Sequence, residues 1–310
     1  MQAWRIVAGS KIEGLKRTAL ARAELQPTQV RVRTHAATLN FRDLMIVNGW
    51  YPLASDREII PGSDAAGTIT EVGSEVTRWR PGDRVATTFF PRWIEGQATP
   101  DKIGDALGGG GDGVFAEELV LSENQFVRVP AHLNDAQAAT LTCAGVTAWH
   151  ALFVAGQTRP GDTVLLLGTG GVSIWALQLA KAAGARVIIT SSSDAKLEHA
   201  VKLGADATIN YKNVPDWHVE ARRLTDGAGA DLVLEVGGSK TVMQSIAATR
   251  IAGTVAIIGA VSGPGGAIDP MMLIGGSTRL QGIYVGSRQM HEDLARFVEV
   301  AKIAPVVDRV

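Results

Sequence analysis

Hydrophobic and polar residues alternate along short stretches of the first 125 residues. Residues 29–35 read Gln-Val-Arg-Val-Arg-Thr-His, and residues 66–73 read Ala-Gly-Thr-Ile-Thr-Glu-Val-Gly. A period of two places neighbouring side chains on opposite faces of a β-strand, so these runs predict half-buried strands. Residues 1–125 are therefore expected to form a β-rich region.

A different pattern begins near residue 134, where apolar runs of strand length alternate with stretches of helix length. The six runs are residues 163–167, 186–190, 207–210, 231–236, 254–259 and 280–285. Continuous apolar strands with crossovers between most of them are typical of an open parallel sheet. This part of the chain predicts an α/β fold with a doubly wound parallel (Rossmann) sheet, followed by a last helix at about residues 289–302.

A glycine cluster follows the first of these six strands directly. Gly168, Gly170 and Gly171 separate the strand from a segment with helical periodicity, with Val172 and Ser173 at its start. A strand, a turn without side chains and a helix N-terminus form a dinucleotide-binding turn, in which free N–H groups face the pyrophosphate. Ser173 stands where the third glycine of the pattern is usual. We expect its hydroxyl to face the pyrophosphate.

A second glycine run, residues 108–111, lies in the segment 91–113. It suggests a phosphate loop, but the residues after it resemble the start of a strand, so no helix N-terminus is available there. A mobile loop is the favoured interpretation, and a loop of this length could form one rim of a substrate cleft.

Length and charge narrow the classes of protein. A chain of 310 residues suggests two domains, and a net charge of −1 without a basic block argues against nucleic acid or a membrane surface as partner. The single cysteine, Cys143, allows no internal disulfide and fits a reducing cytoplasm. No signal peptide is evident, and glycines interrupt the two long uncharged stretches, 163–180 and 251–268.

Several motifs now resemble one family. They are Leu-Asn-Phe-Arg-Asp-Leu at 39–44, Ile-Pro-Gly-Ser-Asp-Ala-Ala-Gly at 60–67, Pro-Gly-Asp-Arg-Val at 81–85, the Gly168 turn, and Gly-Ala-Asp-Ala-Thr-Ile-Asn-Tyr at 204–211. Their order and spacing resemble the medium-chain dehydrogenase/reductase superfamily, and within it the zinc-free quinone oxidoreductase-like branch. The resemblance implies a GroES-like catalytic domain at 1–125 and 287–310, a Rossmann domain at 126–286 and a cofactor cleft where they meet. Members usually continue through a further helix and a closing strand, so we expect the catalytic domain to be incomplete and residues 305–310 to begin a strand.

The resemblance also allows a test for zinc. Zinc-using members carry a cysteine where this chain has Asn40 and a histidine where it has Ser63, while Cys143 falls near their third ligand. A catalytic zinc needs about three converging protein ligands, and the six histidines include no short-spaced pair. We therefore predict no zinc, and we interpret Cys143 as a buried packing residue.

The end of the second strand of the parallel sheet bears on the choice of nicotinamide cofactor. NAD-preferring sites place an acid there to hold the ribose 2′-hydroxyl, but this strand ends in Thr-Ser-Ser-Ser, and Asp194 is better used as a helix N-cap. By resemblance to NADPH-dependent quinone reductases, Ser192, Lys196 and Tyr211 would contact a 2′-phosphate. Each alone has an ordinary structural interpretation, but together they favour NADPH over NADH.

The resemblance implies further roles around the nicotinamide. Asn40 and Thr147 would lie by its ribose or ring, and another group would line the cofactor or close over the carboxamide. That group is Val236, Gly237, Gly259, Val261, Ile283 and Val285.

Tyr51 matches an active-site tyrosine of the family, although an aromatic wall is an equally good interpretation, and Arg42 with Asp43 suggests a structural ion pair. Without zinc, hydride addition to an enone or quinone suits the site better than ketone or alcohol chemistry. Two alternatives stay open: an alcohol dehydrogenase, and an NADPH-binding structural or regulatory protein. Similar proteins form homodimers through the last Rossmann strand, here residues 280–285.

Overall fold

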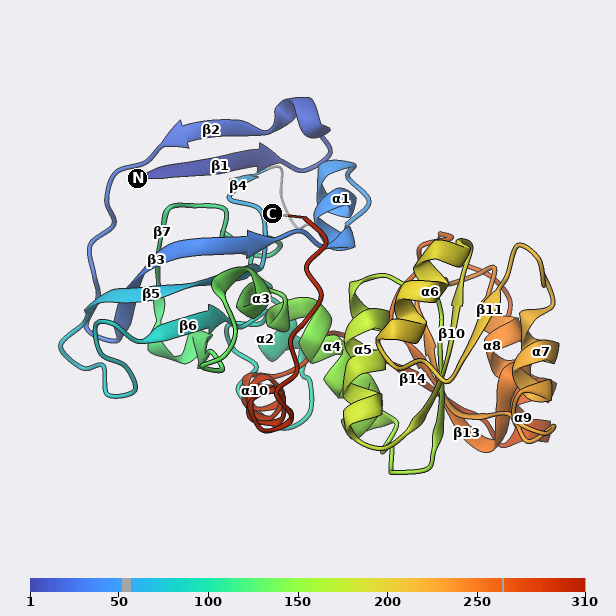
Figure 1. Ribbon diagram of the computed structural model, residues 1–310. Helices are drawn as coiled ribbons and strands as arrows, with labels where there is room; N and C mark the ends of the chain where they lie inside the picture. Colours follow the sequence, from blue (N-terminus) through green and yellow to red (C-terminus); the bar gives the residue numbers. More distant parts are fainter. Residues whose placement is uncertain (52–56, 264, 310) are drawn as a thin grey trace. The chain divides into compact units, whose positions relative to one another are not determined.

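The computed structural model describes residues 1–51, 57–263 and 265–309. The chain divides into unit 1, which comprises Met1–Val146 and Gly286–Val310, and unit 2, which comprises Thr147–Val285 (Figure 1). The predicted start of the second domain at residue 126 is therefore wrong. The reason is that β8 (Phe126–Arg128) pairs with β6 (Arg84–Thr87), and α3 (Asp135–Ala139) packs on the same sheet, so both belong to unit 1.

Unit 1 is β-rich, as the alternating patterns predicted. Its three-stranded antiparallel sheet has the order β2 (Lys16–Ala19), β1 (Gln2–Val7), β4 (Glu58–Ile59). Its five-stranded antiparallel sheet has the order β7 (Glu118–Ser122), β3 (Gln29–Thr38), β5 (Asp64–Val72), β6, β8. Val30 and Val32 of β3 lie in one core with Ile69 and Val85, which stabilises this sheet through burial of apolar surface.

Helical segments complete unit 1. They are α1 (Phe41–Val47), α2 (Pro100–Ile103), α3, the 3₁₀ turns Ile12–Gly14 and Glu123–Gln125, the π-helical turn Leu141–Gly145 and α10 (Arg288–Ala301). The last of these confirms the predicted C-terminal helix. The strand expected after it does not form as far as residue 309, and Val310 lies outside the described residues. Instead, the carbonyl of Ile303 accepts a hydrogen bond from the His132 ring.

The segment 91–113 is not the free loop that was expected. Phe90 and Trp93 are buried, the chain forms α2, and Gly113 donates a backbone hydrogen bond to Ile60. Gly108 has a φ of +64°, and a Cβ there would lie 2.4 Å from the carbonyl oxygen of Gly62. Gly108 therefore allows close backbone packing against Gly62.

Unit 2 confirms the predicted parallel sheet. Its strands have the order β11 (Ala207–Asn210), β10 (Arg186–Ser191), β9 (Thr163–Leu166), β12 (Ala230–Glu235), β13 (Thr249–Ile257), β14 (Arg279–Gly282), and every pairing is parallel. This is the doubly wound order in which the direction of winding reverses between β9 and β12. The ends of these two strands mark the switch point where such sheets bind ligands.

Helices cover both faces of this sheet (Figure 1). The helices are α4 (Val146–Trp149), which continues into the π-helical turn His150–Ala155, and α5 (Gly171–Ala182), α6 (Asp194–Lys202), α7 (Trp217–Arg223), α8 (Val242–Ala248) and α9 (Pro270–Gly276). One apolar core joins Leu165 and Val233 of the strands to Trp217 of α7 and Ile246 of α8. Within the described ranges, no helix has the length and apolar character needed to cross a membrane.

Candidate functional site

The glycine turn of unit 2 has the geometry that a diphosphate requires. Gly168 has a φ of +70°, and a Cβ added at Gly168 or Gly170 would meet no protein atom within 4 Å. Gly170 occupies the N-cap position of the 12-residue helix α5, and no side chain caps that helix. The N–H groups of Gly171, Val172 and Ser173 thus have no partner among the described residues, so donors and open space coincide there, as anion binding requires.

The hydroxyl of Ser173 does not serve the role expected of it. It is buried and donates a hydrogen bond of 2.8 Å to the carbonyl oxygen of Leu167. Leu167 lies just beyond the end of β9, so its carbonyl has no strand partner there and a nearby hydroxyl satisfies it. The expectation that the Ser173 hydroxyl faces the pyrophosphate is therefore wrong, whereas its backbone N–H remains at the helix N-terminus.

Hydroxyl groups at the end of β10 hold the glycine turn. The N–H of Gly168 donates to Thr190 Oγ1 at 3.1 Å, and the Thr169 and Ser191 hydroxyls lie 3.5 Å apart. Asp194 is not the N-cap of α6 as expected: Ser193 occupies that position, and Asp194 accepts a hydrogen bond of 2.6 Å from the Asn210 side chain. The acid is thus tied to the end of β11.

The three residues expected at a 2′-phosphate lie on adjoining elements. Ser192 follows β10 and is partly buried, while Lys196 is exposed on the first turn of α6. Tyr211 follows β11, is 40% exposed and donates its backbone N–H to Ser191 O at 3.1 Å. The fold therefore places all three near the adjacent ends of β10 and β11.

The other residues expected to line the cofactor lie mainly beyond the ends of β12, β13 and β14. Val236 and Gly237 follow β12, Gly259 and Val261 follow β13, and the N–H of Val261 donates to Val236 O at 3.3 Å. These four residues therefore occupy two neighbouring loops.

Ile283 and Val285 follow β14 and have buried side chains. The Val285 carbonyl lies 2.8 Å from Nδ1 of His150, whose pKa is lowered by burial despite that hydrogen bond. Thr147 is buried in α4.

A buried carboxylate organises the polar cluster of unit 1. Asp64, the first residue of β5, is fully buried and accepts hydrogen bonds from Ser63 Oγ (2.5 Å), Cys143 N–H (3.1 Å) and Thr38 Oγ1 (3.3 Å). Asn40 lies beside it with its Nδ2 buried and outside good hydrogen-bond geometry. Burial raises the pKa of Asp64 to about 6, against the opposing effect of the Ser63 and Asn40 side chains. Sequence reasoning missed Asp64, although an acid directly before an apolar strand was a usable signal.

The same cluster contains the three positions at which zinc-using relatives were expected to carry ligands. Asn40, Ser63 and Cys143 all adjoin Asp64, so the structure brings them together. The groups that these residues offer to a metal are an amide, a hydroxyl already hydrogen-bonded to the Asp64 carboxylate, and one thiol. This set does not match a catalytic zinc site. Among residues 1–51, 57–263 and 265–309, no group of three His, Cys, Asp or Glu side chains could hold a metal ion. Cys143 is half-buried rather than buried as expected.

Arg42 and Asp43 form the predicted ion pair. Their charged groups are 3.7 Å apart, and both side chains are 8% exposed. The Arg42 guanidinium lies 4.6 Å from the Phe89 ring centre and 5.8 Å from that of Tyr51. Burial raises the pKa of Asp43, against the lowering effects of the Asn40 N–H and of Arg42. Tyr51 also packs on the cluster of Ile6, Ile46 and Ile59, as the aromatic-wall interpretation requires.

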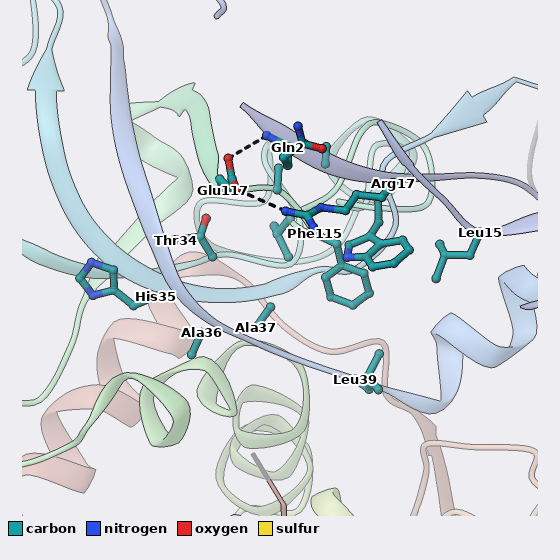
Figure 2. A pocket seen from close by; sticks show the side chains of 14 residues that line it. Gln2, Leu15, Arg17, Thr34, His35, Ala36, Ala37, Leu39, Phe115 and Glu117 are labelled. Carbon is teal, nitrogen blue, oxygen red and sulfur yellow. Dashed lines mark hydrogen bonds and ion pairs between the residues drawn. The ribbon is translucent and has the colours of Figure 1, made fainter. Parts of the chain in front are cut away.

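A pocket of about 640 Å³ lies elsewhere in unit 1, between β1 and the end of β3 (Figure 2). Its walls are mainly apolar, and the Arg17–Glu117 ion pair lies at its edge. None of the expected site residues lines it. Because a functional site needs convergent polar groups, the Asp64 cluster and the glycine turn are the better candidates.

Two family models match the chain, one within unit 1 and one over most of unit 2 and nearly all of α10. Residues 26–131 match the alcohol dehydrogenase GroES-like domain, and residues 171–300 match the zinc-binding dehydrogenase family. A zinc-type alcohol dehydrogenase-like protein of Schizosaccharomyces pombe is 45% identical over 293 residues, which cover 93% of this chain and 85% of that protein. A quinone oxidoreductase of Pseudomonas aeruginosa is 35% identical over 245 residues, which cover 78% and 68%.

Solved structures of similar proteins match the chain over nearly its whole length. A Sinorhizobium meliloti 1021 protein described as an alcohol dehydrogenase has a TM-score of 0.90 and 40% identity, covering 100% of this chain and 92% of that chain. An NAD-dependent alcohol dehydrogenase has a TM-score of 0.88 and 34% identity, and the match covers 99% of this chain and 91% of that chain. The crotonyl-CoA carboxylase/reductase AntE V350A in complex with NADP has a TM-score of 0.85 and 26% identity, and the match covers 98% of this chain and 87% of that chain. The chain belongs to the medium-chain dehydrogenase/reductase superfamily and is an oxidoreductase of that superfamily with a nicotinamide cofactor.

Proposed function

We propose that this protein is an NADPH-dependent reductase that transfers hydride to an enone or quinone without zinc. The observation that carries the proposal is the uncapped N-terminus of α5 behind Gly168 and Gly170, where three N–H groups and open space suit a pyrophosphate.

The preference for NADPH rests on the ends of β10 and β11. Lys196 is exposed there beside Ser192 and Tyr211, and a lysine ammonium suits a 2′-phosphate. Asp194 is tied to Asn210, which lessens its availability for a ribose hydroxyl. The NADP complex of the crotonyl-CoA carboxylase/reductase supports this choice, whereas the NAD-dependent alcohol dehydrogenase favours NADH.

Zinc-independent chemistry is supported by the side chains around Asp64. An amide and a hydroxyl at Asn40 and Ser63 are poor zinc ligands, so the substrate oxygen would be polarised by hydrogen bonds instead. The cofactor would supply a hydride to the β-carbon of an activated C=C bond. Tyr51 is the proposed donor to the developing enolate oxygen, Asn40 beside Asp64 is proposed to lie by the nicotinamide ribose or ring, and solvent supplies the proton.

Two other functions have specific support. Zinc-dependent alcohol oxidation is favoured by the match to the zinc-binding dehydrogenase family and by the name of the Schizosaccharomyces pombe relative. A structural or regulatory NADPH-binding role would need the glycine turn and the ends of β10 and β11 in unit 2, but no donor to a substrate.

A homodimer and a cytoplasmic location belong to the same proposal. β14 is an edge strand of the parallel sheet, and most of its residues are exposed, so a second copy could pair with it. The single cysteine suits a reducing compartment. The protein is expected to elute as a dimer in size-exclusion chromatography with light scattering, and a monomer at micromolar concentration would contradict the pairing.

The test is NADPH oxidation by the purified protein with small enones, quinones and ketones, with and without a chelator, alongside metal analysis. Turnover of enones or quinones that survives chelation is expected. Stoichiometric zinc lost together with activity would establish the alcohol dehydrogenase alternative. Tight NADPH binding without turnover of any compound would favour the structural role.

A further inference from the structure

A second buried acid, Glu235, lies at the carboxyl end of β12 in unit 2 and has no role in the proposed reaction. Its side chain is fully buried. Oε1 accepts hydrogen bonds from the backbone N–H of Gly237 (2.6 Å), the N–H of Gly238 (2.8 Å) and the Thr241 hydroxyl (2.7 Å). Oε2 accepts one from the Ser245 hydroxyl at 2.5 Å. The carboxylate therefore fixes the whole connection from β12 to α8.

The loop after β12 in turn holds the loop after β13. The Gly237 carbonyl accepts hydrogen bonds from both the backbone N–H and the hydroxyl of Ser262, each at 2.7 Å. Ser262 Oγ also accepts from the Lys240 N–H at 3.2 Å. A Cβ at Gly238 would lie 2.8 Å from the Ala260 Cα, so the two loops are in close backbone contact. They therefore behave as one piece.

These two loops belong to one half of the cofactor site. In the doubly wound order, the strands on one side of the switch point take the adenosine nucleotide, because the ribose contact is at the end of the second strand, here β10. The strands on the other side, β12, β13 and β14, are left for the nicotinamide nucleotide. Val236, Gly237, Gly259 and Val261 all lie on the two loops tied to Glu235.

We propose that Glu235 is a positioning residue for the nicotinamide half of the dinucleotide, acting through Gly237 and Ser262. This rests on the proposed cofactor binding. Preorganised loops bind more tightly because the ordering cost is met before the ligand arrives. Replacing Glu235 by alanine leaves two N–H groups and two hydroxyls without their acceptor, and the loops are then free to rearrange.

The test compares NADPH with 2′-phospho-ADP-ribose, which lacks the nicotinamide, by fluorescence or calorimetric titration. Glu235→Ala is expected to weaken NADPH binding about tenfold and to leave binding of the fragment within twofold of the wild type. Glu235→Gln keeps one acceptor oxygen for the three donors on Oε1, and the Ser245 hydroxyl can turn to accept, so this variant should restore most of the affinity.

Asp231→Ala is the matched control on the same strand. Asp231 lies at the opposite end of β12, where it accepts hydrogen bonds from the Thr163 N–H and from Arg250. Its replacement is expected to lower the Tm without changing either dissociation constant. Ser262→Ala removes only one of the two bonds to Gly237 and provides a milder variant should Glu235→Ala fail to fold; it should weaken NADPH binding about threefold.

The outcomes separate the two proposals. Wild-type protein that binds neither NADPH nor NADH would overturn the cofactor proposal itself. Wild-type protein that binds NADPH, together with Glu235→Ala or Ser262→Ala variants that bind it equally well, would overturn only the role of Glu235. Equal loss of affinity for NADPH and for the fragment would also overturn it, because a general loss of structure would then explain the effect.

Discussion

Two fully buried carboxylates, Asp64 in unit 1 and Glu235 in unit 2, are held in different ways. Every group that donates a hydrogen bond to the Glu235 carboxylate lies within ten residues of it in the sequence. Asp64 gathers its donors from Thr38, Ser63 and Cys143, the last 79 positions away, and shares its surroundings with Asp43. A local set of donors fixes a loop, whereas the distant set joins three separate segments of the chain.

The difference has an electrostatic consequence. Burial of Asp64 outweighs its hydrogen bonds, and repulsion from Asp43 adds to the effect, so the pKa of Asp64 rises to about 6. The buried, ionised carboxylate therefore destabilises unit 1. Acids with pKa values shifted in this way are common in functional sites. The glycine turn of unit 2 involves no comparable buried charge.

The largest expected effect concerns the pH dependence of unit 1. A folded-state pKa of about 6, against the ordinary value of 3.8 for an aspartate, means that the native protein binds the proton more tightly than the unfolded chain. The contribution of Asp64 to the free energy of unfolding is therefore greatest below about pH 4. It falls by up to about 3 kcal/mol as the pH rises to about 6, and then levels off. Because asparagine does not titrate, the free energy of unfolding of Asp64→Asn, measured with urea, should rise by that amount relative to the wild type between about pH 4 and 7.

Asp206→Asn is the control for this measurement. Burial works to raise the pKa of Asp206, but hydrogen bonds from Lys181 and Val187 outweigh it and lower the pKa. This variant should therefore lose stability relative to the wild type as the pH rises. A difference between Asp64→Asn and wild type that stays constant with pH would contradict the account of the Asp64 cluster.

The next effect tests the glycine turn of unit 2. A side chain at Gly170 meets no protein atom, and the residue has a φ of −80°, so Gly170→Val should lower the free energy of unfolding only by the N-cap preference for glycine, about 1 kcal/mol. It would fill the space assigned to the pyrophosphate and weaken NADPH binding about 100-fold in a titration. Gly275→Val, also in open space but in α9, serves as the control and should bind normally. Normal binding by Gly170→Val would remove the turn from the cofactor site.

Lys196 tests the neighbouring end of β10 with a smaller effect. Lys196→Ala should weaken NADPH binding about tenfold and leave NADH binding unchanged, because only NADPH carries the 2′-phosphate. Lys202→Ala changes another exposed lysine at the other end of α6 and should affect neither cofactor. An equal loss for NADH and NADPH would assign Lys196 some role other than contact with the 2′-phosphate.

The smallest effect separates packing from binding at Ser173. Because its hydroxyl bonds to the Leu167 carbonyl, Ser173→Ala should lower the free energy of unfolding by about 1 kcal/mol. NADPH affinity should stay the same in the titration. Reduced affinity at unchanged stability would restore the expectation that this hydroxyl faces the pyrophosphate.

The sequence predicted what depends on local patterns. The six strands of unit 2, the glycine turn and α10 each follow from an apolar run or a turn signal within a short window. The Ser173 hydroxyl was misjudged because two acceptors, a phosphate and the Leu167 carbonyl, suit it equally from sequence. Glu235 was missed too, although a charged residue that ends an apolar strand before two glycines was a local signal.

Features that depend on distant contacts could not be predicted in the same way. The Asp64 cluster needs the N–H of Cys143 brought from a π-helical turn, and no periodicity indicates that contact. The domain boundary was placed too early because the partner of β8, β6, lies about forty residues before it. The loop 91–113 was expected to be free, since the glycine run does not reveal that Gly62 packs against it.

The most direct test of the central claim, that unit 2 binds NADPH in preference to NADH, is a fluorescence titration of the wild-type protein with each cofactor. The chain contains seven tryptophans, so intrinsic fluorescence provides a signal. We predict saturable binding of both, with NADPH at least about tenfold tighter. Comparable dissociation constants for the two cofactors would contradict the assignment of Ser192, Lys196 and Tyr211 to a 2′-phosphate.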